Sequence, residues 1–297
     1  MVTSAFVAHL HAILAADSPS AILIKRGPQN QTGTIGWDRR TDSFTAGQCL
    51  RKKIEHREAD LSPDGKYFIY YVNDQSWSRK NHVYRAISLA PWLKALVFWG
   101  SEPSDYGPGV GMFFQDEDGV TRIRGKVEAP AWDHLRIPAV PYDTDTTRWR
   151  SVVHPDAHFF TKLQRDGWIA RTPWEICPAS EAAGEASWRY NESSPHRIIF
   201  EKRLTSGWAL RQTCWSGLHD DMNRGISWET FALVSPTGEL DRRPSWEWAD
   251  VDSDQGRMVW TEDCVLHAAG VSPAGLDHAR PLLDTRSMVF ERLIAPY

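Results

Sequence analysis

The chain has 297 residues, a formal net charge of −4 at neutral pH and hydrophobic residues at 41% of its positions. The acidic balance argues against general nucleic-acid binding, which requires a basic surface. The sequence also lacks the roughly 20 uninterrupted apolar residues that a membrane-spanning helix needs. We therefore expect a soluble, cytoplasmic protein with a large core that binds neither nucleic acid nor a membrane.

Fifteen tryptophans and four cysteines constrain the interior. Tryptophan in this number must lie mostly between packed sheets, because exposure on that scale would cause aggregation. The cysteines are far apart and lack the paired spacing of a structural zinc site. We predict free, buried thiols at Cys49, Cys177, Cys214 and Cys264.

Residues 5–19 are apolar and end in small side chains, as in a secretion signal. However, His9 and His11 interrupt the apolar run, and no Lys or Arg precedes it. We interpret this stretch as the first strand or short helix of the fold. Residues 20–50 continue a strand pattern, with a polar turn over 38–42.

The clearest element covers residues 55–74. A strand-like lead is followed by the turn Ser62-Pro63-Asp64-Gly65, in which proline sets φ and Asp-Gly supplies the residue that closes the turn. The run Tyr67–Val72 is aromatic and β-branched, which favours a half-buried strand. The unit is predicted to be strand, tight turn, strand.

A polar loop at 75–82 follows, with Trp77 and Arg79 among Ser, Lys and Asn. Loops that carry an aromatic side chain among polar ones are common binding sites. Residues 92–140 are less regular. Their glycine-rich stretch 107–111 contains Pro108, which lacks the N–H that a phosphate-binding loop would use, so we expect a bent loop there.

Three further segments, starting near 149, 188 and 246, repeat the pattern of an aromatic-led strand, a polar turn and a second strand. The segments that start near 149 and 188 match at a constant offset of 40 residues. The segment at 55–74 and the one that starts near 246 also share small and acidic turn residues. The matched positions are Phe160, Lys162, Gly167, Trp168 and Arg171 with Phe200, Lys202, Gly207, Trp208 and Arg211, and Ala59, Asp60, Asp64 and Gly65 with Ala249, Asp250, Asp254 and Gly256.

A period of about 40–45 residues built from short antiparallel strands is typical of propeller blades. We predict an all-β fold, a single β-propeller domain over 1–297 with about five short four-stranded blades. One irregular blade is expected near 92–140. The segment 279–297 is expected to supply a strand to the blade begun at the N-terminus, so that both ends close the ring. Unrelated hairpins in a β-sandwich are the alternative.

The turn Ser62-Pro63-Asp64-Gly65-Lys66, together with the end of the chain from Phe290 to Tyr297, resembles a group of uncharacterised bacterial proteins similar to TolB-type propeller repeats. In the 246 segment the turn becomes Asp252-Ser253-Asp254-Gln255-Gly256, and the 149 and 188 segments lack it. The resemblance implies a propeller of the TolB-like or WD40-like kind and a role in protein binding. It carries over no catalytic residue.

Few motifs indicate chemistry. His154 and His158 have the spacing of metal ligands on a helix, but Pro155 between them makes a turn the expected structure. The group His219, Asp220 and Asp221 is either a weak cation site or a solvated loop. No P-loop, GxSxG or HExxH motif is present. We predict no metal, no cofactor and no catalytic residue.

Two functions remain open. We favour a non-enzymatic interaction or scaffold module that binds another protein through its loops. Among the tryptophans, we expect Trp149, Trp188 and Trp246 in the core, and we expect Trp77, Trp99 and Trp215 to be more exposed. Its candidate binding residues are Trp77, Arg79, Trp215, His219, Asp220 and Asp221. The alternative is a hydrolase or lyase, acting on a glycan or small molecule, whose site at the central axis is formed by His56, Arg57, Arg150, Arg189 and Glu247.

Overall fold

The structure is a computed structural model, and it describes residues 8–28, 30–73, 83–100, 112–117, 120–125, 139–141, 157–173, 175–177, 196–204, 206–216 and 227–297. The chain divides into two compact units. Unit 1 comprises Met1–Leu10 and Gly167–Ser287, and unit 2 comprises His11–Asp166 and Met288–Tyr297. No helix in the described part of the chain has the length and apolar character needed to cross a membrane.

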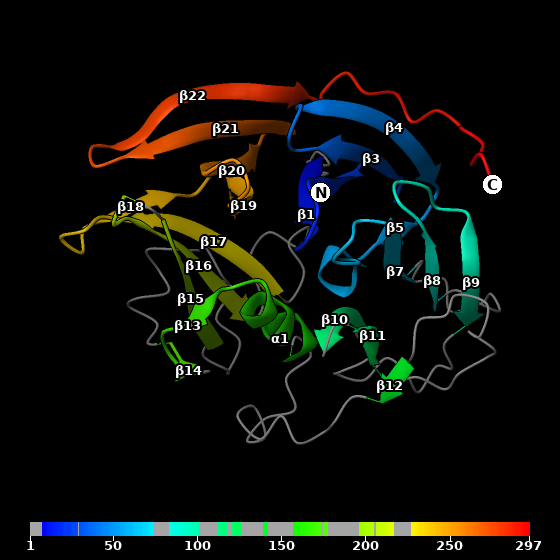
Figure 1. The fold of residues 1–297 in the computed structure, drawn as a ribbon, viewed down its shortest axis with the longest axis horizontal. Coiled ribbons are helices and arrows are strands. Elements are labelled where there is room, and N and C mark those ends of the chain that lie inside the picture. Colours follow the sequence, from blue (N-terminus) through cyan, green and yellow to red (C-terminus); the bar gives the residue numbers. More distant parts are fainter. Residues whose placement is uncertain are drawn as a thin grey trace, which may run out of the picture. The chain divides into compact units, whose positions relative to one another are not determined.

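Unit 2 contains two larger sheets, each with strands in simple chain order (Figure 1). The first consists of β1 (His9–Leu14, whose first two residues belong to unit 1), β2 (Ser20–Arg26), β3 (Thr32–Asp38) and β4 (Ser43–Leu50). The second consists of β5 (Lys53–Ile54), β7 (Tyr67–Asn73), β8 (Val83–Leu89) and β9 (Ala95–Gly100), with β6 (Asp60–Leu61) also paired to β7.

The rest of unit 2 is less regular. A 3-10 turn, η1 (His56–Glu58), separates β5 from β6. A small sheet contains β10 (Phe113–Glu117), β11 (Val120–Gly125) and β12 (Ala139–Pro141), and its last pair is parallel. The helix α1 (Ala157–Arg165) comes last.

Unit 1 contains two sheets. One has β13 (Ile169–Ala170), β14 (Glu175–Ile176), β15 (His196–Arg203), β16 (Ala209–Ser216), β17 (Ser227–Val234) and β18 (Leu240–Arg243). The other is the meander β19 (Trp246–Asp252), β20 (Arg257–Glu262), β21 (Val265–Ser272) and β22 (Gly275–Asp284), whose last two strands run side by side as long ribbons in Figure 1.

The all-β prediction is confirmed, but the blade count is corrected. Four antiparallel sheets are present, as in a four-bladed β-propeller, where we predicted about five. The described part of the expected irregular blade near 92–140 does not form one four-stranded sheet. Instead, β9 completes the sheet begun by β5, and β10–β12 form a separate small mixed sheet.

The predicted turn at 62–65 is confirmed. Gly65 donates its N–H to the Ser62 carbonyl at 2.7 Å and adopts φ +75°, a conformation that glycine reaches without strain. The Ser62 hydroxyl donates to Asp64 at 2.5 Å and accepts the Tyr67 N–H at 2.8 Å. These bonds fix the start of β7.

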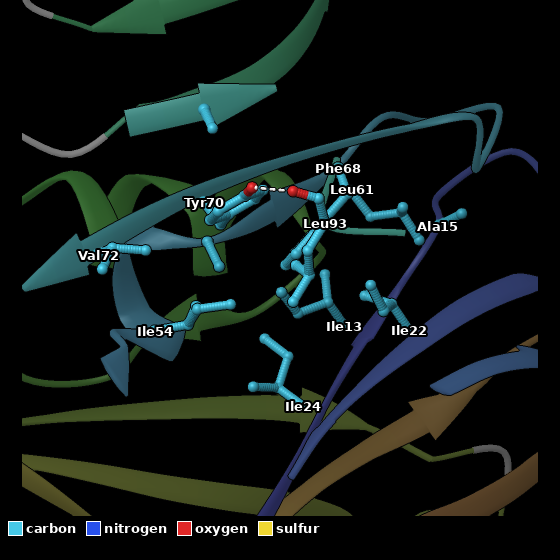
Figure 2. Close-up of a cluster of buried hydrophobic side chains, with 12 residues drawn as sticks. Ile13, Ala15, Ile22, Ile24, Ile54, Leu61, Phe68, Tyr70, Val72 and Leu93 are labelled. Atoms are coloured by element: carbon cyan, nitrogen blue, oxygen red, sulfur yellow. Dashed lines mark hydrogen bonds between the residues drawn. The ribbon is translucent and has the colours of Figure 1, made fainter. Parts of the chain in front are cut away.

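The core of unit 2 lies between its two larger sheets (Figure 2). Apolar side chains of β1 and β2 pack against those of β7, because alternate residues of each strand face the same side. The buried hydroxyl of Tyr70 donates to the Leu93 carbonyl at 2.6 Å, the dashed line in Figure 2. The labelled members of this cluster are Ile13, Ala15, Ile22, Ile24, Ile54, Leu61, Phe68, Tyr70, Val72 and Leu93.

The 40-residue offset holds only at its turn. Gly167 and Gly207 both have positive φ, +87° and +85°. However, Lys162 lies on α1, whereas Lys202 lies on β15. Trp168 is buried, but Trp208 is half-exposed. The segment that starts at 149 therefore contains a helix where we predicted a strand. The spacing of its apolar and charged residues fits a helix because the basic side chains recur at every third or fourth position.

The predicted closing strand at 279–297 was also wrong in part. Residues up to Asp284 belong to β22, in the meander of β19–β22, and residues 285–297 form no strand. The sheet of β1–β4 is built only from consecutive N-terminal strands. Residues 288–297 carry Pro296 and are held mainly by side chains, so they do not extend the ladder.

Candidate functional site

The predicted loop site is not assembled in the described part of the chain. Trp77, Arg79, His219, Asp220 and Asp221 all lie outside the described residues. Trp215 was predicted to be exposed, but it is buried, with 2% of its surface accessible. It lies on β16, stacks on Trp228 with ring centroids 6.2 Å apart, and donates its indole N–H to Thr230. Its polar sequence neighbours concealed the alternation of a strand.

The structure describes only some of the other tryptophans that the sequence analysis singled out. Trp246 is buried, as predicted for the core, and stacks on Trp260 at 5.1 Å. Trp149 and Trp188 lie outside the described residues, and Trp99 lies on β9 with a side chain that is not described. No disulfide joins the four cysteines, all of which lie in the described part of the chain. Three are buried as predicted, whereas Cys49 is only partly buried.

Two of the predicted axial residues form part of a cluster in unit 2. His56 and Arg57 lie on η1, the turn between β5 and β6. The His56 imidazole contacts that of His11 on β1, with ring centroids 4.3 Å apart and planes tilted by 37°. Both histidines keep part of their surface accessible. We name the group of His11, His56, Arg57 and Lys162 the imidazole site.

The cations of the imidazole site share one aromatic ring. The Arg57 guanidinium lies 5.2 Å from the centre of the Phe159 ring, and the Lys162 ammonium lies 5.3 Å from it. The Lys162 ammonium also donates to the carbonyls of Ala59 at 2.7 Å and Arg57 at 3.3 Å. Because these carbonyls and the ring face replace water, a buried ammonium is tolerated here.

The cations and burial together determine the charge of the two imidazoles. Burial lowers the pKa of His11 well below its ordinary value, and the positive charges of Lys162 and Arg57 lower it further. Burial also lowers the pKa of His56, and His11, Arg57, Lys53 and Lys162 act in the same direction. Both rings are therefore neutral at pH 7, and each retains one N–H donor and one acceptor nitrogen.

One face of α1 holds η1 and β6 in place. His158, Lys162 and Arg165 are spaced four and three residues apart, which places them on the same side of the helix. His158 approaches Glu58 at 2.9 Å, with Nε2 facing a carboxylate oxygen. Lys162 bonds the two carbonyls described above. The helix thus holds the backbone carbonyls of Arg57 and Ala59, next to His56.

Arg165 makes the strongest of these contacts. Its guanidinium donates to both oxygens of Asp60, at 2.6 and 3.0 Å, and to both oxygens of Asp166, at 2.7 and 3.1 Å. It also donates to the carbonyl of Phe114. Asp60 is fully buried and accepts the Phe114 N–H at 2.7 Å. These carboxylates are engaged by Arg165, so the field at the two imidazoles remains positive.

Of the other predicted axial residues, the structure describes Glu247. Glu247 lies on β19 in unit 1, where it accepts the N–H of Leu10 at 2.6 Å and that of Cys264 at 3.4 Å. Burial raises the pKa of Glu247 to about 7, although these two hydrogen bonds act in the opposite direction. Arg150 and Arg189 lie outside the described residues.

Sequence reasoning missed His11, Phe159 and Lys162. His11 was visible as a polar interruption of an apolar strand. The helical spacing of His158, Lys162 and Arg165 would have revealed the polar face of α1, but Pro155 led us to predict a turn. In fact His158 is helical, while His154 lies outside the described residues. Among the residues that the structure describes, no three His, Cys, Asp or Glu side chains are grouped to hold a metal.

Comparison with known proteins assigns no family. A scan of the chain against protein-family models found no match, and a search of curated proteins found none either. The similarity to TolB-type repeats therefore depends on the turn Ser62–Lys66 and the end of the chain, and it stays a prediction.

Proposed function

We propose that the protein binds a small anionic ligand, a carboxylate or phosphate, at the imidazole site of unit 2. The observation that carries this proposal is the contact of two neutral, partly accessible imidazoles at 4.3 Å beside Arg57 and Lys162. Imidazole N–H groups and a guanidinium are the donors that oxyanions prefer, and a charged partner makes each such bond shorter and stronger.

The positive field gives a further reason to expect an anion. The field of Arg57 and Lys162 disfavours protonation of both histidines. A bound anion would oppose that field, so the pKa of each imidazole would rise on binding. Because linkage is reciprocal, the anion binds more tightly as the pH falls through the range where the imidazoles take up a proton.

Isothermal titration of the full chain with inorganic phosphate and with citrate tests the proposal. We expect saturable binding that tightens as the pH falls below 6.5, with proton uptake beyond that of the ligand itself visible as a dependence of the heat on the buffer. His56→Gln and Arg57→Gln should each weaken binding about tenfold, the loss of one charge-assisted contact. His278→Gln is the matched control, since this imidazole is on β22 in unit 1 and its side chain is 93% exposed.

Equal affinity in the His56 and His278 variants would reject the imidazole site. The imidazole site would also be rejected if a chain with a native circular dichroism spectrum showed no saturable binding of either anion.

Hydrolase or lyase chemistry is the second candidate, and the neutral state of His56 favours it. An unprotonated imidazole near neutral pH is suited to act as a general base, and Arg57 could then stabilise developing negative charge. A rate with a nitrophenyl ester or phosphate that disappears in His56→Gln but persists in His278→Gln would support this. A rate equal in both variants would count against it.

Capture of a partner protein through the loops remains a separate proposal, supported by the composition of residues 75–82 and by the repeat resemblance. Trp215 no longer belongs to it, because this side chain is buried. Alanine substitutions at Trp77, Arg79 and His219–Asp221 should reduce capture of the partner in pull-downs. Unchanged capture by these variants would argue against a loop site.

A further inference from the structure

Residues 288–297 form an extended segment that docks on unit 2 although it follows β22 of unit 1. The segment pairs with no strand of either larger sheet of unit 2. It is held at separate points by side chains. Val289 and Ile294 point outward, with 73% and 87% of their surface exposed, whereas Ala295 is buried. This is how a bound extended peptide is held, with inward anchors between outward residues.

The first anchor is the Phe290 ring, which lies on two glycines. A Cβ added to Gly27 would lie 2.5 Å from the ring, and one added to Gly33 would lie 2.9 Å from it. Any other residue at either position would therefore displace the ring. The ammonium of Lys25 lies 5.7 Å from the ring centre. The end of β2 and the start of β3 thus form a shaped seat for one phenyl group.

The other anchors are polar. The Gln48 side chain donates to the carbonyl of Leu293 at 2.9 Å, while its own oxygen accepts the N–H groups of Leu93 and Lys94, both at 2.8 Å. The Tyr297 hydroxyl donates to the Lys94 carbonyl at 2.6 Å and accepts the Leu89 N–H at 3.2 Å. Unit 2 therefore contacts the Leu293 carbonyl and the Tyr297 hydroxyl of the segment at separate points, and not through the ladder of backbone hydrogen bonds that a strand edge would form.

We infer that this face of unit 2 is a binding site for an extended peptide with a phenylalanine anchor, and that the 288–297 segment of a second copy of this chain can replace the chain's own segment. Exchange requires only that side-chain anchors be released, since no β-ladder has to be broken. Because the chain's own 288–297 segment is covalently attached, its effective concentration at the site is high. The segment of a second copy therefore competes best when the Phe290 anchor of the chain's own segment is weakened.

A labelled peptide with the sequence of residues 288–297 tests the site by fluorescence anisotropy. The full chain carrying Phe290→Ala should bind this peptide at least about tenfold more tightly than the wild-type chain, in which the cis segment competes. A peptide with Phe290→Ala should bind the same chain at least about tenfold more weakly, because the phenyl group that packs on Gly27 and Gly33 is lost. A peptide with Ile294→Ala is the matched control, since Ile294 is exposed, and its affinity should be unchanged.

Complementation of two full-length variants tests exchange between copies. The Phe290→Ala chain has an open seat and a defective segment, whereas the Gly33→Ala chain has a blocked seat and an intact segment. Analytical ultracentrifugation should show monomers for each variant alone and a dimer for the mixture. A mixture that remains monomeric would overturn the exchange. Peptide binding that is absent, or that weakens equally with Phe290→Ala and Ile294→Ala, would overturn the site.

Discussion

The two units arrange their buried charges differently. Unit 1 contains the Trp215–Trp228 and Trp246–Trp260 stacks, and its buried carboxylates, Asp252 and Glu201, each pair with arginine on strands or next to them. Unit 2 has an apolar core of strand residues, but it also buries a series of charged groups between α1 and the turn η1. A buried charge is stable only with a specific partner. The charged groups beside α1 are therefore the part of unit 2 that tolerates substitution least.

The largest expected effect comes from breaking that charged region at Asp60. Asp60→Asn removes the charge that Arg165 contacts through two hydrogen bonds and leaves a mostly buried guanidinium with less compensation. We expect the free energy of unfolding to fall by about 3–5 kcal/mol, measured by denaturant titration.

The matched control for this variant is Asp241→Asn in unit 1, which breaks the exposed pair with Arg243. Its effect should stay below about 0.5 kcal/mol. Similar losses in the two variants would mean that the charges of unit 2 are no more important than surface pairs.

The contributions of Glu247 in unit 1 and His56 in unit 2 to the pH dependence of stability should have opposite signs. The pKa of Glu247 in the fold is about 7, compared with an ordinary 4.5, so the folded state binds the proton more tightly. Stability is therefore lost as the pH rises from 4.5 through 7, by about 3 kcal/mol for this group. Glu247→Gln stays neutral, and its advantage over the wild type should grow between pH 5 and pH 8 in denaturant titrations. A constant difference across that range would contradict the shift.

His56 in unit 2 should contribute with the opposite sign to Glu247. Burial lowers the pKa of His56 in the fold, so the unfolded chain takes up the proton first as the pH falls. Its contribution to stability is present above pH 6.5 and is lost below it. His56→Gln should therefore lose less stability than the wild type between pH 7.5 and pH 5.5. Equal acid sensitivity in the two chains would show that His56 titrates normally.

Features that depend on neighbouring residues could be predicted from the sequence, and those that depend on distant partners could not. Strand alternation and turn residues are local, so the strand Tyr67–Asn73 and the turn before it could be read directly. The imidazole site could not, because Lys162 bonds the carbonyl of Ala59, 103 residues away. No local pattern encodes such a partner. His56 and Arg57 were selected for their place in a repeat, and α1 then interrupted that repeat.

Turn glycines provide the finest comparison between the units, because Gly65 and Gly256 occupy matched turns with φ of +75° and +61°. A Cβ on Gly256 would meet nothing within 4 Å, so Gly256→Ala should lower the free energy of unfolding only by the left-handed strain, about 1 kcal/mol. A Cβ on Gly65 would lie 2.4 Å from the Cβ of Ser20, in the neighbouring sheet of unit 2, and 2.7 Å from the hydroxyl oxygen of Ser18. Gly65→Ala should therefore cost about 2 kcal/mol or more, because steric overlap adds to the strain.

Denaturant titration of the two alanine variants, and of a Ser18→Gly and Ser20→Gly chain with and without Gly65→Ala, separates these contributions. Removal of both serine side chains should leave an alanine effect at residue 65 close to that at Gly256, since only the backbone strain is then common to both turns. If Gly65→Ala retains its full effect in the serine-free chain, the contact between the turn and residues 18–20 does not determine the tolerance of this position, and local backbone geometry alone distinguishes the two turns.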